Sequence, residues 1–417
     1  MPGVRPGVAG VRDPGNVVNA FKLLMRREQN VSRMGRFTKS ECCHIARHYL
    51  PSKSRIVDQM HSKAYIGQFN KQGDTFIGCF QNKSIRLYDT ETDFKLRKEV
   101  QARGLRWTIT DTSLSPDQRW LVYSSITPIV HMVNMASSGA TSIANVTDIH
   151  ETLDFGPDQC GLYGRQGIWS LEFSHDGREI AAGMGAGDPA LCLLDMDTGK
   201  VTVRVRGHRD DVNAVRYADA SSNILFTGSD DRMCKVWDRR ILGSTSGAPV
   251  GVLLGHTEGI THIDSKGDGL HLISNGKDQA VRLWDIRKML NPSEAREALQ
   301  RWHFPQFHWD YRCMDYPGVG LAIRHPRDCS VQAYRGHRVL ETLIRCYFSP
   351  MHTTGQRYIY TGSHEGSVHM YDVVTGKEMR KLDAHISTVR DMSWHPTLPL
   401  LVSVSWDGTI RRWDHQR

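Results

Sequence analysis

A Trp-Asp pair closes an apolar run twice in this chain, and an arginine follows each pair two residues later. The two copies read Val236-Trp237-Asp238-Arg239-Arg240 and Leu283-Trp284-Asp285-Ile286-Arg287. A Gly-His pair precedes each copy, at Gly207-His208 and Gly255-His256, and 47 positions separate the two tryptophans. Units of this length with these two markers are typical of four-stranded blades repeated around a central axis. The spacing therefore predicts an all-β propeller.

The same marker position recurs often enough to count the blades. A third clear copy is Trp413-Asp414, aromatic variants stand at Tyr88-Asp89 and Tyr371-Asp372, and degraded copies stand at Val133-Asn134 and Leu194-Asp195. Together they mark seven units, so we expect a seven-bladed propeller over residues 54–417.

One interval between markers is about twice as long as the others, because an insertion lies at about 288–333. The insertion is rich in aromatic residues, so we expect it to fold back over one face of the ring. Its Trp309-Asp310-Tyr311-Arg312 string imitates the marker but lacks the preceding β-run, and it does not count as a blade.

The chain ends three residues after Asp414, which leaves the last blade without an outer strand of its own. An unpaired sheet edge promotes aggregation, so the N-terminal side must supply the missing strand. The best candidate is Ser54-Arg55-Ile56-Val57-Asp58. Closure of this kind makes the two ends of the ring depend on each other.

The residues before the ring divide into a flexible tail, 1–15, and a short helical extension, 16–53. Asn16 to Gln29 places Val17, Val18, Phe21, Leu24 and Met25 on one helical stripe. Thr38 or Ser40 could cap a second helix that runs through Leu50 and ends at Pro51. The two helices either pack on the rim of the propeller or form a docking element for a partner.

Three blades carry a His, a Ser or Thr, an Asp and a Trp at matching positions. Buried side chains of these types satisfy one another's hydrogen bonds, and the set recurs at blade spacing, so we interpret it as structural rather than catalytic. The members are His208, Thr227, Asp231 and Trp237, then His256, Ser274, Asp278 and Trp284, and then His385, Ser403, Asp407 and Trp413.

The sequence carries no pattern of an enzyme, a metal site or a cofactor site. Cys42-Cys43-His44 with His48 lacks a fourth ligand at a suitable spacing. Gly276-Lys277 continues with Asp278, so it is not a phosphate-binding loop, and Gly243 to Gly247 lacks the strand-to-helix context of a hydrolase elbow. We therefore predict a non-catalytic chain without cofactor or metal.

Composition limits the classes of partner. No apolar run reaches the roughly 18 residues of a membrane span, and no secretory leader is evident, so we expect no membrane partner. The nine cysteines form no paired motif, which favours a reducing compartment inside the cell, in the nucleus, the cytoplasm or both. The net charge of +8 is spread among acidic residues without a basic run, so a nucleic-acid partner is not indicated.

Arg240 and Arg287 are the strongest candidates for a binding site. Both follow the third strand of a blade, so they should lie on the same face of adjacent blades. Arginine anchors interfaces through a fixed fork of donors. The alternative is a local salt bridge to Asp238 or Asp285, which needs no partner.

These residues resemble the degenerate box of the WD-repeat substrate receptors of cullin-4 ubiquitin ligases, which ends in Trp-Asp-x-Arg. Leu225 to Ser229, Asp231, and Val236 to Arg240 fit that box. The second copy departs from it at Asn275, and the terminal copy has Arg412 and Gln416 where an aliphatic residue and the arginine are expected. The resemblance extends from about residue 55 to the end of the chain and also covers plant members of this group. It rests on longer strings at Gly207 to Val215, Ile263 to Asp268, Trp309 to Arg312, Tyr334 to His337 and Thr342 to Cys346.

The resemblance implies a role and two partners. The chain would hold the adaptor damaged-DNA-binding protein 1, and with it cullin-4, through Asp238, Arg240, Asp285 and Arg287, with the N-terminal helices as a further contact. Its other face would present an unidentified target protein for ubiquitination and proteasomal degradation. The alternative is a scaffold propeller of another intracellular complex. Residues that open the first strand of a blade should lie on this other face. On this basis the target-binding candidates are Asp211, Asn213, Glu258, Thr261, Arg345 and Arg390.

Overall fold

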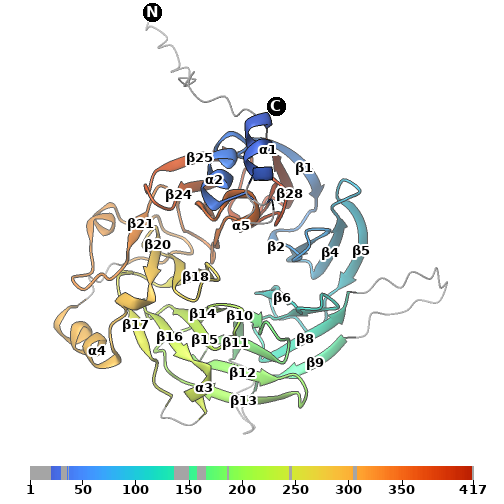
Figure 1. Ribbon diagram of the computed structural model, residues 1–417. Helices are drawn as coiled ribbons and strands as arrows, with labels where there is room; N and C mark the ends of the chain where they lie inside the picture. Colours follow the sequence, from blue (N-terminus) through green and yellow to red (C-terminus); the bar gives the residue numbers. More distant parts are fainter. Residues whose placement is uncertain are drawn as a thin grey trace, which may run out of the picture.

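The structure is a computed structural model, and it describes residues 20–29, 35, 37–135, 150–156, 166–185, 187–243, 247–303 and 308–415. The predicted flexible tail, 1–15, lies outside the described residues. Seven four-stranded antiparallel sheets surround a central axis (Figure 1). The predicted seven-bladed propeller with a short helical N-terminal extension is therefore confirmed. None of the helices in these described segments is long and apolar enough to cross a membrane.

The strands of each blade follow one another outward from the channel, and we call them first to fourth. Blade one contains β2 (Ala64–Phe69), β3 (Thr75–Phe80), β4 (Ser84–Asp89) and β5 (Lys95–Gln101). Blade two contains β6 (Thr112–Leu114), β7 (Trp120–Tyr123), β8 (Ile129–Asn134) and β9 (His150–Asp154). Blade three contains β10 (Gly167–Phe173), β11 (Glu179–Gly185), β12 (Leu191–Asp195) and β13 (Lys200–Val205).

The second half of the ring repeats this order. Blade four contains β14 (Val212–Tyr217), β15 (Ile224–Ser229), β16 (Cys234–Asp238) and β17 (Gly251–Leu253). Blade five contains β18 (Ile260–Ser265), β19 (His271–Gly276), β20 (Ala280–Asp285) and β21 (Gln332–Tyr334). Blade six contains β22 (Cys346–Phe348), β23 (Tyr358–Gly362), β24 (Ser367–Asp372) and β25 (Glu378–Asp383). Blade seven contains β26 (Val389–Trp394), β27 (Leu401–Ser405), β28 (Thr409–Asp414) and, from the start of the chain, β1 (Lys53–Gln59). All seven marker positions used to count blades end a third strand.

The predicted closure strand is confirmed. β1 pairs antiparallel with β28, with Ser54 opposite Trp413. Asp58 then ties the closed blade to blade one, because its carboxylate accepts hydrogen bonds from Arg86 Nη1 at 2.7 Å and from the Tyr88 hydroxyl at 2.5 Å. The first and last strands of the ring are thus held by the same short segment.

The core is divided among the junctions between blades. At the junction of blades four and five, for example, Phe226 packs with Ile260 and Trp284, and all three side chains are fully buried. Each blade therefore completes its hydrophobic core only against its neighbours, as expected for a repeat fold.

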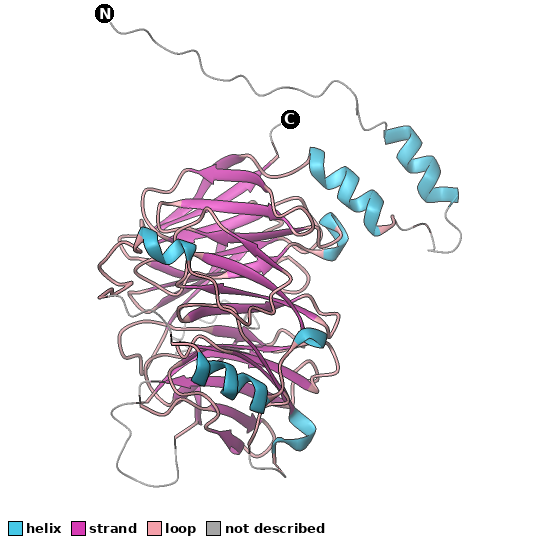
Figure 2. Cartoon of the chain, turned by 90° about the vertical axis from the view of Figure 1, so that its left-hand side faces the viewer, coloured by secondary structure: helices cyan, strands magenta, loops and turns pink. Residues whose placement is uncertain are grey.

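Within the described residues, seven short helical segments lie outside the sheets. They are α1 (Ala20–Gln29), α2 (Lys39–His48), α3 (Arg239–Leu242), the 3-10 helix η2 (Ile286–Lys288), α4 (Pro292–Arg301), the 3-10 helix η3 (Gly318–Ala322) and α5 (Met351–Thr354). Thr38 is the N-cap of α2, because its hydroxyl accepts from the Glu41 amide while the Glu41 carboxylate accepts from the Thr38 amide. The N-terminal helices stand beside one face of the ring (Figure 2).

The insertion starts at the end of β20 and passes the outer edge of the ring. There Ala295 and Ala298 of α4 pack on Met233, Val252 and Leu254. The following residues reach the opposite face, where the Tyr311 carbonyl accepts from the Glu341 amide at 2.7 Å. The insertion therefore folds back over one face of the ring, as the sequence predicted.

Candidate functional site: two faces of the propeller

Strand order assigns each loop to one of two faces. In an antiparallel blade, the connections from first to second strand and from third to fourth strand open on the same side. We call this side the lower face, and the side with the second-to-third connections and the Gly-His loops the upper face. α3 and η2 lie in third-to-fourth connections and α5 lies in a first-to-second connection, so all three belong to the lower face.

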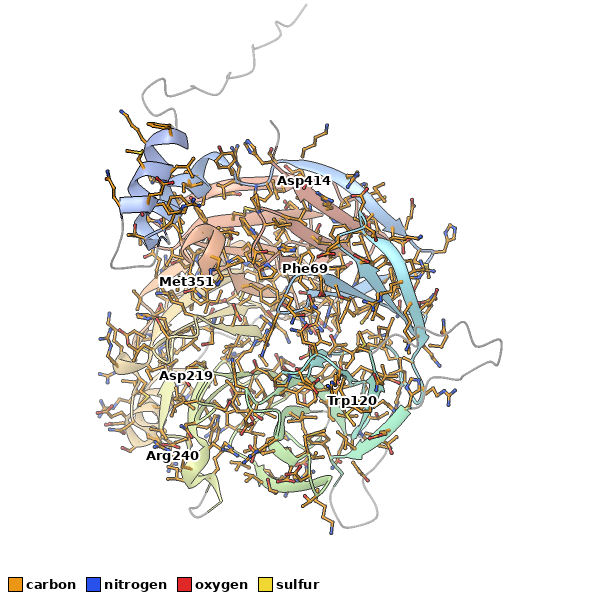
Figure 3. All side chains as sticks on the ribbon, turned by 45° about the vertical axis from the view of Figure 1, so that its right-hand side comes forward. Phe69, Trp120, Asp219, Arg240, Met351 and Asp414 are labelled. Carbon is orange, nitrogen blue, oxygen red and sulfur yellow. The ribbon has the colours of Figure 1, made fainter. Side chains whose placement is uncertain are left out.

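The two predicted adaptor-binding arginines lie on this lower face in adjacent blades. Their side chains are 66% and 65% exposed. Figure 3 places Arg240 at the periphery of the ring, away from the central axis. The predicted common face is thus observed, and both guanidinium groups reach solvent.

Each arginine is oriented by the aspartate of its own Trp-Asp pair. Asp238 is the N-cap of α3 and accepts from the Arg240 amide at 3.0 Å, from Nε at 2.9 Å and from Nη2 at 2.6 Å. Asp285 does the same for η2 and Arg287, with 3.0 Å to the amide, 2.9 Å to Nε and 2.7 Å to Nη2. These hydrogen bonds hold the pKa of Asp285 at about 2. Each arginine therefore forms the local salt bridge and is still accessible to a partner, since one edge of its guanidinium is bonded while the side chain stays largely exposed.

The N-terminal helices join the same face. α2 packs on α5, and the Cys43 thiol donates to the Thr354 carbonyl at 3.3 Å. An apolar pocket of about 220 Å³ opens between α2 and the lower loops of blades six and seven, and Tyr49 and Trp394 line it. On α1 the large side chains Phe21, Leu24 and Met25 are exposed. One helix therefore packs on the ring and the other presents an apolar stripe.

The three predicted structural groups form hydrogen-bonded sets in their blades. In blade four, His208 contacts Asp231 at 2.8 Å and Thr227 at 2.7 Å, and Trp237 Nε1 donates to the same threonine at 2.8 Å. The corresponding contacts in blade five join His256 to Asp278 at 2.9 Å and Ser274 at 2.7 Å, and Trp284 to Ser274 at 2.7 Å. In blade seven they join His385 to Asp407 at 3.0 Å and Ser403 at 2.7 Å, and Trp413 to Ser403 at 2.7 Å. All three imidazoles are buried, which leaves no open approach for a substrate.

Asn275, where the second box departs from the family pattern, connects two blades. Its side-chain amide donates to the Ile344 carbonyl at 3.0 Å, and its Oδ1 lies 3.0 Å from Nε2 of His337 in the Gly-His loop of blade six. A small residue could not make either contact. The departure thus has a packing reason that only the neighbouring blade reveals.

The six predicted target-binding residues do not form one surface. Asp211, Asn213 and Arg390 line a cavity at the upper mouth of the channel. Thr261 is buried and donates to the Ile344 carbonyl, and Arg345 is buried in an ion pair with Asp111 at 2.6 Å. Glu258 is largely covered and faces Arg232 at 3.6 Å. Thr261 and Arg345 are buried among partners within the ring and do not line this cavity, so the prediction that they belong to the target surface is wrong.

The cavity has a volume of about 390 Å³. Only three of its lining residues were predicted from the sequence, and Trp107 and Tyr311 are among those that were missed. Trp107 precedes a blade whose repeat is degraded, and Tyr311 belongs to the insertion. The only available signal was the aromatic content of these two segments. In the described part of the chain, no cluster of three or more His, Cys, Asp or Glu side chains is placed to hold a metal ion.

Comparison with known proteins agrees with this architecture. The family model described as WD domain, G-beta repeat matches residues 199–238, 247–285 and 376–414. The chain is 48% identical to the LEC14B protein of Lithospermum erythrorhizon, over 96% of this chain and 83% of that relative. It is 30% identical to the DDB1- and CUL4-associated factor 11 homolog of Caenorhabditis briggsae, over 97% of this chain and 73% of the relative. For the homolog of the same name in Caenorhabditis elegans the identity is 34%, over 88% of this chain and 64% of the relative. The chain therefore belongs to the WD-repeat family that contains the LEC14B proteins and the DDB1- and CUL4-associated factor 11 homologs.

Proposed function

We propose that this chain is a non-catalytic substrate receptor of a cullin-4–RING ubiquitin ligase. Its lower face docks the adaptor damaged-DNA-binding protein 1, and its upper face holds a target protein inside the cell. The ubiquitin chemistry belongs to partner subunits, and this chain contributes proximity and orientation of the target. The names of the two Caenorhabditis relatives support the assignment of partners.

One observation carries the proposal. Arg240 and Arg287 lie on one face of neighbouring blades, each more than half exposed and each fixed by its own aspartate. A guanidinium that is already oriented loses little conformational entropy when it binds a partner, so a fixed pair is suited to anchor an interface. The exposed apolar stripe of α1 and the apolar pocket beside α2 extend this face and supply the hydrophobic area that stable interfaces need.

The experiment replaces both arginines with alanine in the full chain and measures co-purification with the adaptor. We expect Arg240→Ala with Arg287→Ala to reduce adaptor recovery at least about tenfold, since two anchor residues are removed. A matched control is Arg178→Ala, which removes an exposed arginine from the lower face of blade three. The thermal unfolding midpoint should be unchanged in both proteins.

Adaptor recovery at the wild-type level in the double variant would show that the arginines are only local braces for Asp238 and Asp285. In that case the assigned docking site is wrong. Co-purification of the wild-type chain from cells separates the receptor from the rival function, a scaffold of another complex: cullin-4 subunits favour the receptor, and their absence favours the scaffold.

A further inference from the structure

The cavity at the upper mouth of the channel has a floor and a rim of different chemistry. Arg390 of β26 and the aromatic ring of Tyr65 form its floor, and residues from the loops before the first strands form its rim. Below the floor the channel is filled by buried side chains, among them Arg345 and Asp391. A ligand can therefore enter this cavity only from the upper face.

Arg390 is a buried cation without a carboxylate partner. It is 4% exposed, and its Nη1 and Nη2 donate to the carbonyls of Tyr65 at 2.5 Å and Thr110 at 3.1 Å. Its Nε has no partner, and within the described residues no carboxylate lies at ion-pairing distance from it. The neighbouring Arg345, by contrast, is paired with both Asp111 and Asp391.

Asp391 and Asp111 offset part of the positive charge of Arg390 electrostatically, but neither forms an ion pair with it. Burial, followed by repulsion from Arg345, lowers the pKa of Arg390 to about 10. A buried charge without a partner is costly, and buried cations at the bottom of a concave site are associated with anion recognition. A second cation placed here would be repelled by both arginines.

The rim carries more acidic than basic side chains and is lined by aromatic rings. Asp211, Asp230, Glu341 and Arg312 line it, together with Trp107, Trp169 and Tyr311. Asp230 is already paired with Lys277 at 2.7 Å. Trp107 is 51% exposed and has a φ of +76°, and Glu341 has a φ of +65°. Residues other than glycine that are held in this strained region cluster at binding sites, where the surrounding structure fixes them. Large exposed aromatic side chains at the centre of a face are also the usual anchors of interfaces.

We propose that this cavity recognises an internal segment of the target protein in which one Asp or Glu side chain is flanked by basic residues. The acidic side chain enters between Trp107 and Tyr311 and binds the Arg390 guanidinium, while the flanking Lys or Arg side chains face Asp211 and Glu341. The choice of this occupant follows from the guanidinium without an ion pair on the floor and from the excess of carboxylates over guanidinium groups on the rim. The inference rests on the proposed function, because it names the class of target segment that the receptor holds.

The experiment selects peptides on the immobilised full-length chain. Phage displaying randomised twelve-residue internal segments are enriched on the wild-type chain and on Arg390→Gln, and the bound pools are sequenced. We expect the wild-type pool to converge on one acidic position with basic neighbours, and the Arg390→Gln pool to lose that position. In synthetic blocked peptides from the wild-type pool, replacing the selected Glu by Gln should weaken binding about tenfold or more.

Two further variants keep the result interpretable. Asp211→Asn with Glu341→Gln should reduce the preference for basic neighbours and leave the acidic position. Trp107→Ala removes an exposed side chain and should weaken all selected peptides while the unfolding midpoint stays the same. If Arg390→Gln does not fold, the comparison of Glu and Gln peptides on the wild-type chain still tests the proposal.

The proposal is overturned if no peptide is enriched, if Glu and Gln peptides bind equally, or if lysine occupies the selected position. It is also overturned if a second library with free C-termini shows that a terminal carboxylate is required. None of these outcomes affects the docking of the adaptor. Arg390→Gln should recover the adaptor at the wild-type level, so failure here is distinct from failure of the proposed function.

Discussion

At the scale of single residues, one hydroxyl satisfies two partners in each of the three structural groups. Thr227 bonds both His208 and Trp237 Nε1 in blade four. Thr227→Val keeps the volume but leaves Nε2 of His208 and Nε1 of Trp237 buried without a hydrogen bond. We expect the free energy of unfolding to fall by about 2–4 kcal/mol. Urea unfolding measures the effect, and Thr227→Ser, which keeps the hydroxyl, should cost less than about 1 kcal/mol. An equal loss in both variants would contradict this role.

A second prediction at this scale concerns His337. Asn275 Oδ1 can only accept, so Nε2 of His337 carries the hydrogen, and Nδ1 accepts from the Tyr371 hydroxyl at 3.2 Å. Burial, and then repulsion from His369, lowers the pKa of His337 to about 3. The unfolded chain, with a histidine pKa of about 6.5, therefore binds a proton first as the pH falls, and stability is lost below about pH 6.5.

The measurement compares wild type with His337→Gln at about pH 7 and about pH 5. The stability of the wild type relative to the variant should fall by about 2 kcal/mol over this interval, because 1.5 pH units lie below the unfolded pKa. The comparison is needed because Glu172 acts in the opposite direction. Burial raises its pKa to about 7, so acidification to pH 5 stabilises the fold at that site in both proteins. If the difference in free energy of unfolding between wild type and His337→Gln does not change with pH, the prediction is wrong.

At the scale of elements, β1 is the part on which closure depends. A chain that starts at Pro51 retains β1, whereas a chain that starts at Ala64 leaves the edge of β28 unpaired. The second chain loses a whole strand pairing, worth several kcal/mol, and at about 2 °C per kcal/mol its unfolding midpoint should fall by roughly 5–10 °C. Size-exclusion chromatography should show it as aggregated and the Pro51 chain as monomeric. Two monomeric proteins of equal midpoint would mean that β1 does not close the ring.

The elements also show what a sequence can predict. The Trp-Asp spacing located all seven third strands, because a repeated blade must repeat its markers. The unpaired edge of the last blade predicted that a strand such as β1 pairs with it. The path of the insertion was predictable only in outline, since no repeat fixes where Tyr311 lies. In the candidate site, positions at the start of first strands identified Asp211, Asn213 and Arg390 as lining residues. The same rule failed for Thr261 and Arg345, because side-chain direction depends on register within the strand.

At the scale of the whole molecule, carboxylates on or just before first strands connect neighbouring blades at three junctions. The carboxylate of Asp111 accepts from the Leu171 amide of blade three, Asp264 from the Phe348 amide of blade six, and Asp391 from the Gly67 amide of blade one. Sequence reasoning missed this ladder, although acidic residues within apolar first strands were its visible signal. The ladder joins neighbours, whereas Arg345 also spans the channel, because it pairs Asp391 of blade seven with Asp111 at the start of blade two.

Arg345 therefore tests whether the ring is stabilised as one unit. Arg345→Met removes the ion-pair partner of the buried carboxylates of Asp111 and Asp391, and we expect the free energy of unfolding to fall by about 3–5 kcal/mol. Adding Asp111→Asn to that variant removes one uncompensated charge while the amide keeps its size. The double variant should then be more stable than the sum of the two single effects predicts, by at least about 1 kcal/mol. Urea unfolding of the four proteins measures this coupling, and strictly additive effects would mean that Arg345 does not join blades two and seven.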